Sequence, residues 1–260
     1  MIVIKLGGNA LAASGNNDWI EAIARTFNSG RKIILVHGGG PQIDEELAIH
    51  GRSKSVIDGY RVTDEGAFEI VEMVLAGRVQ QSLVRMLRGA ELPAVGVTGS
   101  DGALFDVVKK NSPSGADLGQ VGEITNVNTH LVETLLAKGF LPVVSSVSSD
   151  QQGVGFNVNA DLAAGALAGA FKAEQVIFLT DVPGIYRNYP QEDSLIARIS
   201  LMELQELLPS LATGMIPKVE AVIAALESGA RSAYVIDGRD GVALSHLLAG
   251  RVVGTEVVHG

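Results

Sequence analysis

The segment Ile33-Ile34-Leu35-Val36-His37-Gly38-Gly39-Gly40-Pro41 contains the pattern that decides the fold. Its first five residues form an apolar run typical of a buried strand, and a helical pattern follows from Pro41 to His50. Three glycines between them allow a sharp turn with accessible backbone N–H groups, and proline is favoured in the first turn of a helix. The segment therefore predicts a strand, a glycine-rich turn and a helix.

The same pattern recurs along the chain. Further strand-like apolar runs are Ile2–Leu6, Ala94–Thr98, Pro142–Ser146, Gln175–Thr180 and Ala233–Asp237. Stretches of helical period lie between the runs, at Trp19–Ser29, Glu65–Arg88, Thr129–Lys138, Ala160–Ala170, Leu201–Leu208 and Pro217–Ser228. Alternation of strands and helices predicts βαβ units and an α/β fold with a mostly parallel central sheet.

One segment departs from this alternation. Residues Phe105–Asn126 contain short β-like pieces around three glycines, which predicts hairpins that project over one edge of the sheet. No linker rich in proline or serine separates the two halves of the chain. We therefore expect two lobes, residues 1–172 and 173–260, that share one continuous sheet.

Composition excludes several classes of function. The chain has 260 residues, 47% of them hydrophobic, and a net charge of −9, which argues against binding nucleic acid or an anionic membrane. It has no cysteine, so disulfides, thiol catalysis and cysteine metal sites are excluded. The N-terminus lacks a signal-peptide layout, and no apolar run approaches the ~20 residues of a membrane span. We expect a cytoplasmic protein.

Glycine pairs and triplets stand at the carboxyl ends of the first two predicted strands, where ligands collect in open α/β sheets. Lys5 precedes Gly7 and Gly8, and the triplet Gly38–Gly40 follows His37. Such turns bring N–H groups close to an anion, although sharp-turn sterics alone also explain them. Neither turn has the spacing of a Walker A loop or a dinucleotide fingerprint. We expect His37 to be structural rather than a catalytic base.

A polar stretch, Asn157-Val158-Asn159-Ala160-Asp161, precedes an Ala/Leu/Gly run of helical character. In an extended segment its three polar side chains face the same way. Amides both donate and accept hydrogen bonds, which suits them to a small polar ligand. The structural alternative is that Asp161 caps the following helix.

Three charged residues elsewhere have two interpretations each. Arg61 is either a clamp for a carboxylate or a surface arginine, just before a helix cap at Thr63 or Asp64. Asp181 either bonds a ribose hydroxyl or starts a turn. Lys218 lies at a helix start, where a cation opposes the helix dipole, so it indicates an anionic ligand unless it is simply solvated.

Together these pieces resemble the amino acid kinase superfamily, and within it the branch that phosphorylates acetylglutamate in arginine biosynthesis. The matching pieces follow the family's order over nearly the whole chain: Lys5–Gly8, His37–Pro41, Arg61–Thr63, Asn157–Asp161, Thr180–Ile185 and Gly214–Lys218. The resemblance implies an open αβα sandwich. Residues 1–172 would then bind the acyl amino acid and dimerise, and residues 173–260 would bind the nucleotide.

The resemblance also implies the reaction and the site. MgATP and N-acetyl-L-glutamate would give ADP and the γ-acyl phosphate. The implied catalytic residues are Lys5, Lys218, Asp161, Gly8 and Gly40, with Asp161 orienting both lysines. The implied substrate site is Gly39, Gly40, Arg61, Asn157 and Asn159. The implied nucleotide site is Lys5, Gly7, Gly8, Asp181, Gly184, Tyr186, Met215 and Lys218. Mg²⁺ would be held mainly by the ATP phosphates rather than by protein side chains.

Two departures from the family pattern concern assembly and substrate. Arginine-inhibited members carry an extra N-terminal helix, whereas the first predicted strand here begins at Ile2, so we expect a homodimer without arginine feedback. The insert at Tyr186–Pro190 resembles the lysine-biosynthesis branch, which acts on acetylaminoadipate or on a substrate carried by an acidic protein. A non-catalytic ligand sensor on the same fold is a further alternative.

Overall fold

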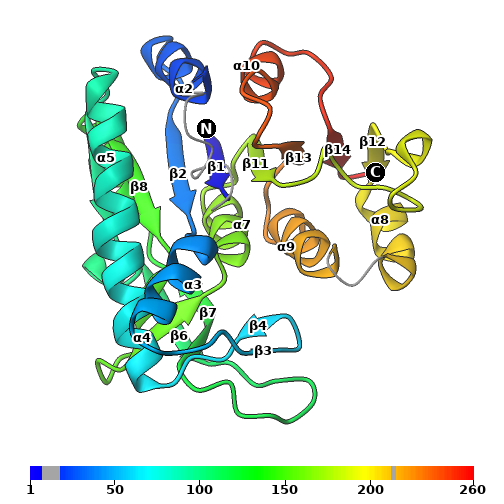
Figure 1. The fold of residues 1–260 in the computed structure, drawn as a ribbon. Helices are drawn as coiled ribbons and strands as arrows, with labels where there is room; N and C mark the ends of the chain where they lie inside the picture. Colours follow the sequence, from blue (N-terminus) through cyan, green and yellow to red (C-terminus); the bar gives the residue numbers. More distant parts are fainter. Residues whose placement is uncertain (8–17, 212–214) are drawn as a thin grey trace. The chain divides into compact units, whose positions relative to one another are not determined.

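The computed structural model describes residues 1–7, 18–211 and 215–260 (Figure 1). Contacts divide the chain into two compact units: a terminal unit, Met1–Leu35 with Ala164–Gly260, and a middle unit, Val36–Ala163. The predicted lobes, 1–172 and 173–260, were defined by the ligand that each would bind. They differ from this division because the first 35 residues pack with the C-terminal part. Their ligand assignment stays a prediction.

The terminal unit is built on a mostly parallel sheet. Strand β1 (Ile2–Leu6) pairs in parallel with β11 (Gln175–Thr180), which pairs in parallel with β13 (Ser232–Asp237). Beyond β13, β14 (Thr255–Val258) is antiparallel to it, and β12 (Arg198–Ser200) is parallel to β14. Strands β1 and β11 are nearly continuous apolar runs because both of their faces are buried. The predicted α/β fold with a mostly parallel central sheet is confirmed.

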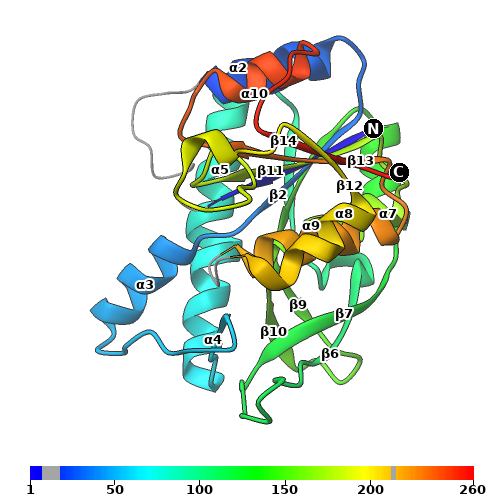
Figure 2. The same ribbon diagram turned by 90° about the vertical axis from the view of Figure 1, so that its right-hand side faces the viewer.

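Four α-helices of the described residues lie wholly within the terminal unit. They are α2 (Asp18–Asn28), α8 (Leu201–Leu207), α9 (Ile216–Glu227) and α10 (Ala243–Leu248). Figure 2 shows α2 and α10 side by side. Helix α8 begins with a capping box, in which the Ser200 side chain accepts from Glu203 N and the Glu203 carboxylate accepts from Ser200 N. Short 3₁₀ turns, η3 (Glu192–Ser194) and η4 (Leu208–Ser210), complete this region.

A long helical segment in three parts dominates the middle unit (Figure 1). Its parts are α4 (Glu65–Glu72), the π-helical segment η1 (Met73–Val79) and α5 (Gln80–Gly89). The predicted helix at Glu65–Arg88 is confirmed in extent, but its seven-residue π-helical segment was not predicted. Gln80 follows this segment, and its buried Nε2 donates to Val97 O at 2.7 Å and Val143 O at 3.1 Å.

The remaining elements of the middle unit form a parallel pair, a second sheet and a hairpin. Strands β5 (Ala94–Val97) and β8 (Leu141–Ser145) are parallel. The second sheet has the order β6 (Phe105–Lys109), β7 (Val121–Val127), β10 (Gly155–Val158), β9 (Val147–Ser149). The other elements are the hairpin β3 (Val56–Ile57) with β4 (Tyr60–Arg61), helices α3 (Gly40–Ile49) and α6 (His130–Ala137), and the turn η2 (Asp101–Ala103).

The segment that departs from the βα alternation forms one hairpin, β6–β7, and not several. It does not stand alone, because β10 pairs in parallel with β7 and β9 pairs with β10 to extend it. Helix α7 (Ala160–Ala170) follows β10, so the polar stretch lies at a strand-to-helix junction. No helix among the described residues is long and apolar enough to cross a membrane.

Candidate active site

The glycine turn after β2 (Ile33–His37) is shaped by its neighbours in the middle unit. A Cβ atom on Gly39 would lie 2.8 Å from Leu75 Cδ2 and 3.1 Å from Val79 Cγ2, both on η1. A Cβ atom on Gly38 would lie 3.3 Å from Ala160 Cβ. Helix α3 then begins at Gly40 with proline in its first turn and no side-chain cap. The turn is therefore glycine because it packs closely, and it presents the uncapped N-terminus of α3.

His37, the last residue of β2, is completely buried. Its Nδ1 lies 3.1 Å from Gly38 O, and a carbonyl oxygen only accepts, so Nδ1 carries the proton. Its Nε2 is then an acceptor, for which the described residues provide no hydrogen-bond donor. Burial lowers the pKa of His37 to about 4 against the opposing effect of the Gly38 contact. The imidazole is therefore neutral at pH 7.

Arg61, at the end of β4, is not a surface arginine, because only 12% of its side chain is exposed. Its Nη1 forms an ion pair at 2.5 Å with Asp44 Oδ1 on α3, and its Nη2 donates to Gly40 O at 3.3 Å. Partial burial raises the pKa of Asp44, but contacts with Arg61 and Lys54 outweigh it and hold that pKa below its usual value. The guanidinium is thus fixed beside the glycine turn.

Asn157 on β10 is connected to the same arginine through Thr63. Asn157 Nδ2 donates to Thr63 Oγ1 at 3.2 Å, and the buried Thr63 Oγ1 donates to Arg61 O at 2.8 Å. Asp64 caps α4, since its side chain accepts from Ala67 N, which confirms the predicted cap. Gly39, Gly40, Arg61 and Asn157 are therefore gathered in one region of the middle unit.

The polar stretch after β10 does not continue as a strand. β10 ends at Val158 and α7 begins at Ala160, so the prediction that all three polar side chains line one face of an extended segment is wrong. The cap is Asn159, not Asp161: Asn159 Oδ1 accepts from Asp161 N at 2.8 Å and Leu162 N at 3.3 Å. Asp161 lies in the first turn of α7 and is half-buried.

Lys5 and Gly7 lie at the carboxyl end of β1 in the terminal unit. A Cβ atom on Gly7 would lie 2.7 Å from Leu179 O on β11, so only glycine fits there. The same position is 3.7 Å from Lys5 Nζ, which shows that the lysine ammonium lies over the Gly7 backbone. The predicted site residue Gly8 lies outside the described residues, as does Gly214 of the last matching piece.

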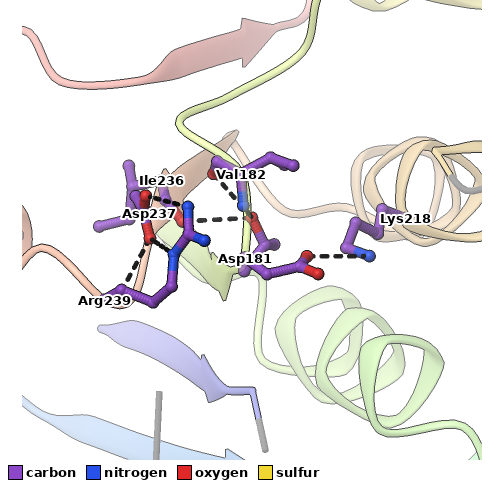
Figure 3. A network of polar contacts seen from close by, with 7 residues as sticks. Asp181, Val182, Lys218, Ile236, Asp237 and Arg239 are labelled. Atoms are coloured by element: carbon purple, nitrogen blue, oxygen red, sulfur yellow. Dashed lines mark hydrogen bonds and ion pairs between the residues drawn. The ribbon is translucent and has the colours of Figure 1, made fainter. Parts of the chain in front are cut away.

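Asp181 and Lys218 form an ion pair in the terminal unit (Figure 3). Asp181 follows β11, Lys218 lies in the first turn of α9, and their Oδ1 and Nζ atoms are 3.5 Å apart. The Lys218 side chain is 26% exposed, so it is not simply solvated. The turn after β11 is held by Thr180, whose Oγ1 accepts from Val182 N, so the Asp181 side chain is not needed to start it. Met215, buried, precedes α9, which has no side-chain cap.

Two residues beside this pair were missed by the sequence analysis. Arg239 donates from Nε to Asp237 Oδ1 at 2.9 Å and from Nη2 to Asp237 Oδ2 at 2.7 Å, and Figure 3 shows the fork next to Asp181. Asp237 raises the pKa of Arg239, and Asp181 adds to the effect. The available signal was the position of Asp237 at the carboxyl end of a predicted strand.

Gly184 and Tyr186 take part in packing within the terminal unit. A Cβ atom on Gly184 would lie 2.6 Å from Thr255 Oγ1, the hydroxyl that accepts from Ile185 N. Tyr186 is buried, and its ring meets the ring of Tyr189 edge-on with centroids 5.6 Å apart. Over the described residues, no three His, Asp or Glu side chains are grouped as metal ligands.

The fold and these residues define a class of protein. The model of the amino acid kinase family matches residues 1–237, and the chain belongs to that family. It is 44% identical over 243 residues to the acetylglutamate kinase of Streptomyces avermitilis, covering 92% of this chain and 80% of that protein. It is 40% identical over 268 residues to the acetylglutamate kinase of Mycobacterium sp. (strain JLS), covering 100% of this chain and 91% of that protein.

A solved structure shows the same fold. The N-acetylglutamate synthase from Neisseria gonorrhoeae, complexed with coenzyme A and N-acetyl-glutamate, superposes with a TM-score of 0.87 at 24% identity. The alignment covers 100% of this chain and 59% of the synthase, so the chain spans little more than half the length of that protein. The likeness shows the fold alone.

Proposed function

We propose that the chain is an acetylglutamate kinase, which transfers a phosphoryl group from ATP to the side-chain carboxylate of N-acetyl-L-glutamate in the second step of arginine biosynthesis. The observation that carries the proposal is 40% identity to a kinase of that name over the whole chain. The fixed guanidinium of Arg61 beside the glycine turn supports it, because the substrate carries a carboxylate to be clamped.

The substrate site that we propose lies in the middle unit. Arg61 binds the α-carboxylate, and Asn157 and Asn159 bind the acyl amino acid beside it. The backbone N–H groups of Gly39 and Gly40, at the uncapped start of α3, face the carboxylate that receives the phosphoryl group.

The nucleotide site that we propose lies in the terminal unit. Lys218 and the uncapped N-terminus of α9 favour phosphate, since both are positive. Lys5 with Gly7 and Gly8 forms a second phosphate contact, and the close packing at Gly7 leaves the backbone free of a side chain. We assign the remainder of the site to Asp181, Gly184, Tyr186 and Met215.

Catalysis in this proposal needs alignment and positive charge rather than a base, because the accepting carboxylate is already ionised at pH 7. We assign Lys5 and Lys218 to stabilisation of the transferring group, Gly8 and Gly40 to N–H donation, and Asp161 to the catalytic residues. Mg²⁺ would be held mainly through the substrate phosphates and would supply positive charge beside them. Asp181, half exposed beside Lys218, has the oxygen chemistry to contact it, so the residues fit.

Assembly and location complete the proposal. We expect a homodimer, which is the commonest soluble oligomer, without feedback inhibition by arginine. We expect a cytoplasmic enzyme, since ATP is its co-substrate. Light scattering of the purified chain and an activity assay in the presence of arginine test the first two expectations.

Acetylaminoadipate is the substrate that competes most closely with acetylglutamate in this proposal. Acetylaminoadipate is longer by one methylene, and discrimination of one methylene is only about 1–3 kcal/mol. Release of ADP should be measured with acetylglutamate, acetylaminoadipate and free glutamate. We expect the highest kcat/KM with acetylglutamate. A higher kcat/KM with acetylaminoadipate would instead indicate a kinase of lysine biosynthesis. Activity with none of the three would favour a carrier-bound substrate or a non-catalytic sensor.

A further inference from the structure

Asp44 on α3 bridges two cations beside the predicted carboxylate clamp. Its Oδ1 lies 2.5 Å from Arg61 Nη1, and its Oδ2 lies 3.2 Å from Lys54 Nζ. Nothing in the sequence pattern marks Asp44 as functional, because a carboxylate in the middle of an amphipathic helix ordinarily faces solvent. Here the carboxylate is instead only 36% exposed and is directed at a nearly buried arginine.

We propose that Asp44 is the positioning residue for Arg61. The inference rests on the proposed function, in which Arg61 binds the α-carboxylate of acetylglutamate. Asp44 does not touch the substrate in this proposal. It holds the guanidinium in the orientation that the substrate requires. The conformational entropy of the Arg61 side chain is therefore lost on folding and not on substrate binding.

The contacts of Arg61 show how the orientation is fixed. Asp44 forms an ion pair with Nη1 and Gly40 O accepts a hydrogen bond from Nη2, and both partners belong to α3. The guanidinium is therefore tied to the helix that begins at the glycine turn, at a fixed place relative to the N–H groups of that turn. The Thr63 hydroxyl, which donates to Arg61 O, holds the backbone of the same residue.

The charges lead to the same conclusion. Arg61, Lys54 and Asp44 together carry one net positive charge, which matches a single substrate carboxylate. Without Asp44, two cations that now share one anion would repel each other, and Arg61 would lose the contact that directs Nη1. The contrary possibility is that Asp44 merely occupies Arg61 in competition with the substrate. Removing a competitor would lower the KM, whereas removing a positioning residue raises it.

The test is steady-state kinetics of Asp44→Ala and Asp44→Asn. Partners that orient metal-ligating side chains are typically worth 10–100-fold, and by analogy we expect Asp44→Ala to raise the KM for acetylglutamate about tenfold. The kcat and the KM for ATP should stay within about twofold, since Asp44 acts only on the carboxylate clamp. Asp44→Asn keeps an acceptor without the charge, so its KM should rise about threefold.

A matched control lies on the same helix. Glu45 pairs with Arg78 at 2.7 Å, and both side chains are exposed, so Glu45→Ala removes a similar ion pair away from Arg61. It should leave both KM values unchanged. Asp44→Ala should also add no further rise in the KM in an Arg61→Ala background, because its effect passes through Arg61.

The outcomes separate the inference from the function on which it rests. An unchanged or lowered KM in Asp44→Ala, or an equal rise with and without Arg61, would overturn the positioning role. If Asp44→Ala does not fold, an unchanged or lowered KM in Asp44→Asn does the same. Absence of acetylglutamate phosphorylation by the wild-type chain would instead refute the proposed function.

Discussion

Acidification from pH 7.5 to pH 5 should destabilise the protein through His37. Its pKa is about 4 in the folded chain and 6.5 in the unfolded chain. Between these values the unfolded chain binds a proton that the folded chain does not, so the stabilisation is fully present above pH 6.5 and is lost as pH falls toward 4. At 1.36 kcal/mol per pKa unit, the depressed pKa corresponds to about 3 kcal/mol of unfolding free energy.

The structural cause is burial of a ring that has no means of stabilising a charge. His37 is 0% exposed, and Nδ1–H already donates to Gly38 O. Protonation of Nε2 would create a buried cation, and the described residues place no hydrogen-bond partner at that nitrogen. Protonation of His37 would destabilise the glycine turn, because His37 directly precedes Gly38.

Urea denaturation between pH 5 and 7.5 measures the effect on wild type, His37→Asn and the control His50→Asn. Asparagine keeps an N–H near the position of Nδ1 and does not titrate. Wild type and His50→Asn should lose up to about 1.4 kcal/mol per pH unit below pH 6.5 relative to His37→Asn. The same pH dependence in all three proteins would refute the reasoning. If His37→Asn does not fold, a His37 imidazole resonance that titrates near pH 6.5 in wild type refutes it equally.

Three further substitutions test the site and the core. Lys5→Ala should reduce kcat by about 10²–10³-fold or more and leave the ATP dissociation constant nearly unchanged, and near-normal kcat would remove Lys5 from catalysis. Arg61→Ala should raise the KM for acetylglutamate by about 10–100-fold through loss of a charged hydrogen bond, and an equal rise for ATP would argue against a clamp. Gln80→Leu leaves two strand carbonyls without their amide donor and should cost about 1–3 kcal/mol in urea denaturation. Wild-type stability would show that those carbonyls are satisfied by other donors.

Local pattern was sufficient for most elements. Ile2–Leu6, Ile33–His37, Gln175–Thr180 and Ala160–Ala170 were predicted with the bounds that the structure has. The three strands among them are largely apolar runs that end directly before a glycine or a charged residue, so the neighbouring residue marks the limit of each strand. By contrast β12, β14 and α10 have three, four and six residues, too few to establish a period.

The long-range contacts of the site were not accessible in the same way. The π-helical segment η1 is a change of hydrogen-bond register that leaves no mark in the hydrophobic pattern, yet it supplies the two side chains against Gly39. The role of Asp44 depends on Arg61, an arginine that the fold brings to it from another element. The sequence pattern indicates Arg61 but not its partner Asp44, because ion pairs across elements depend on tertiary structure.

The change of cap from Asp161 to Asn159 has a consequence for substrate recognition. Asn159 Oδ1 is occupied by two backbone N–H groups, so what this side chain offers a ligand is its amide N–H donors. Asn157 offers a ligand the opposite group. Its Nδ2 already donates to Thr63, and its Oδ1 is an acceptor. An N-acetyl group has one C=O acceptor and one N–H donor, which are the chemical complements of the groups that the two asparagines offer. The ammonium of free glutamate has no acceptor for Asn159. We therefore expect the asparagine pair to select for the acyl group, and Asn159→Asp, which keeps the cap but removes the donors, to reduce the preference for acetylglutamate over glutamate.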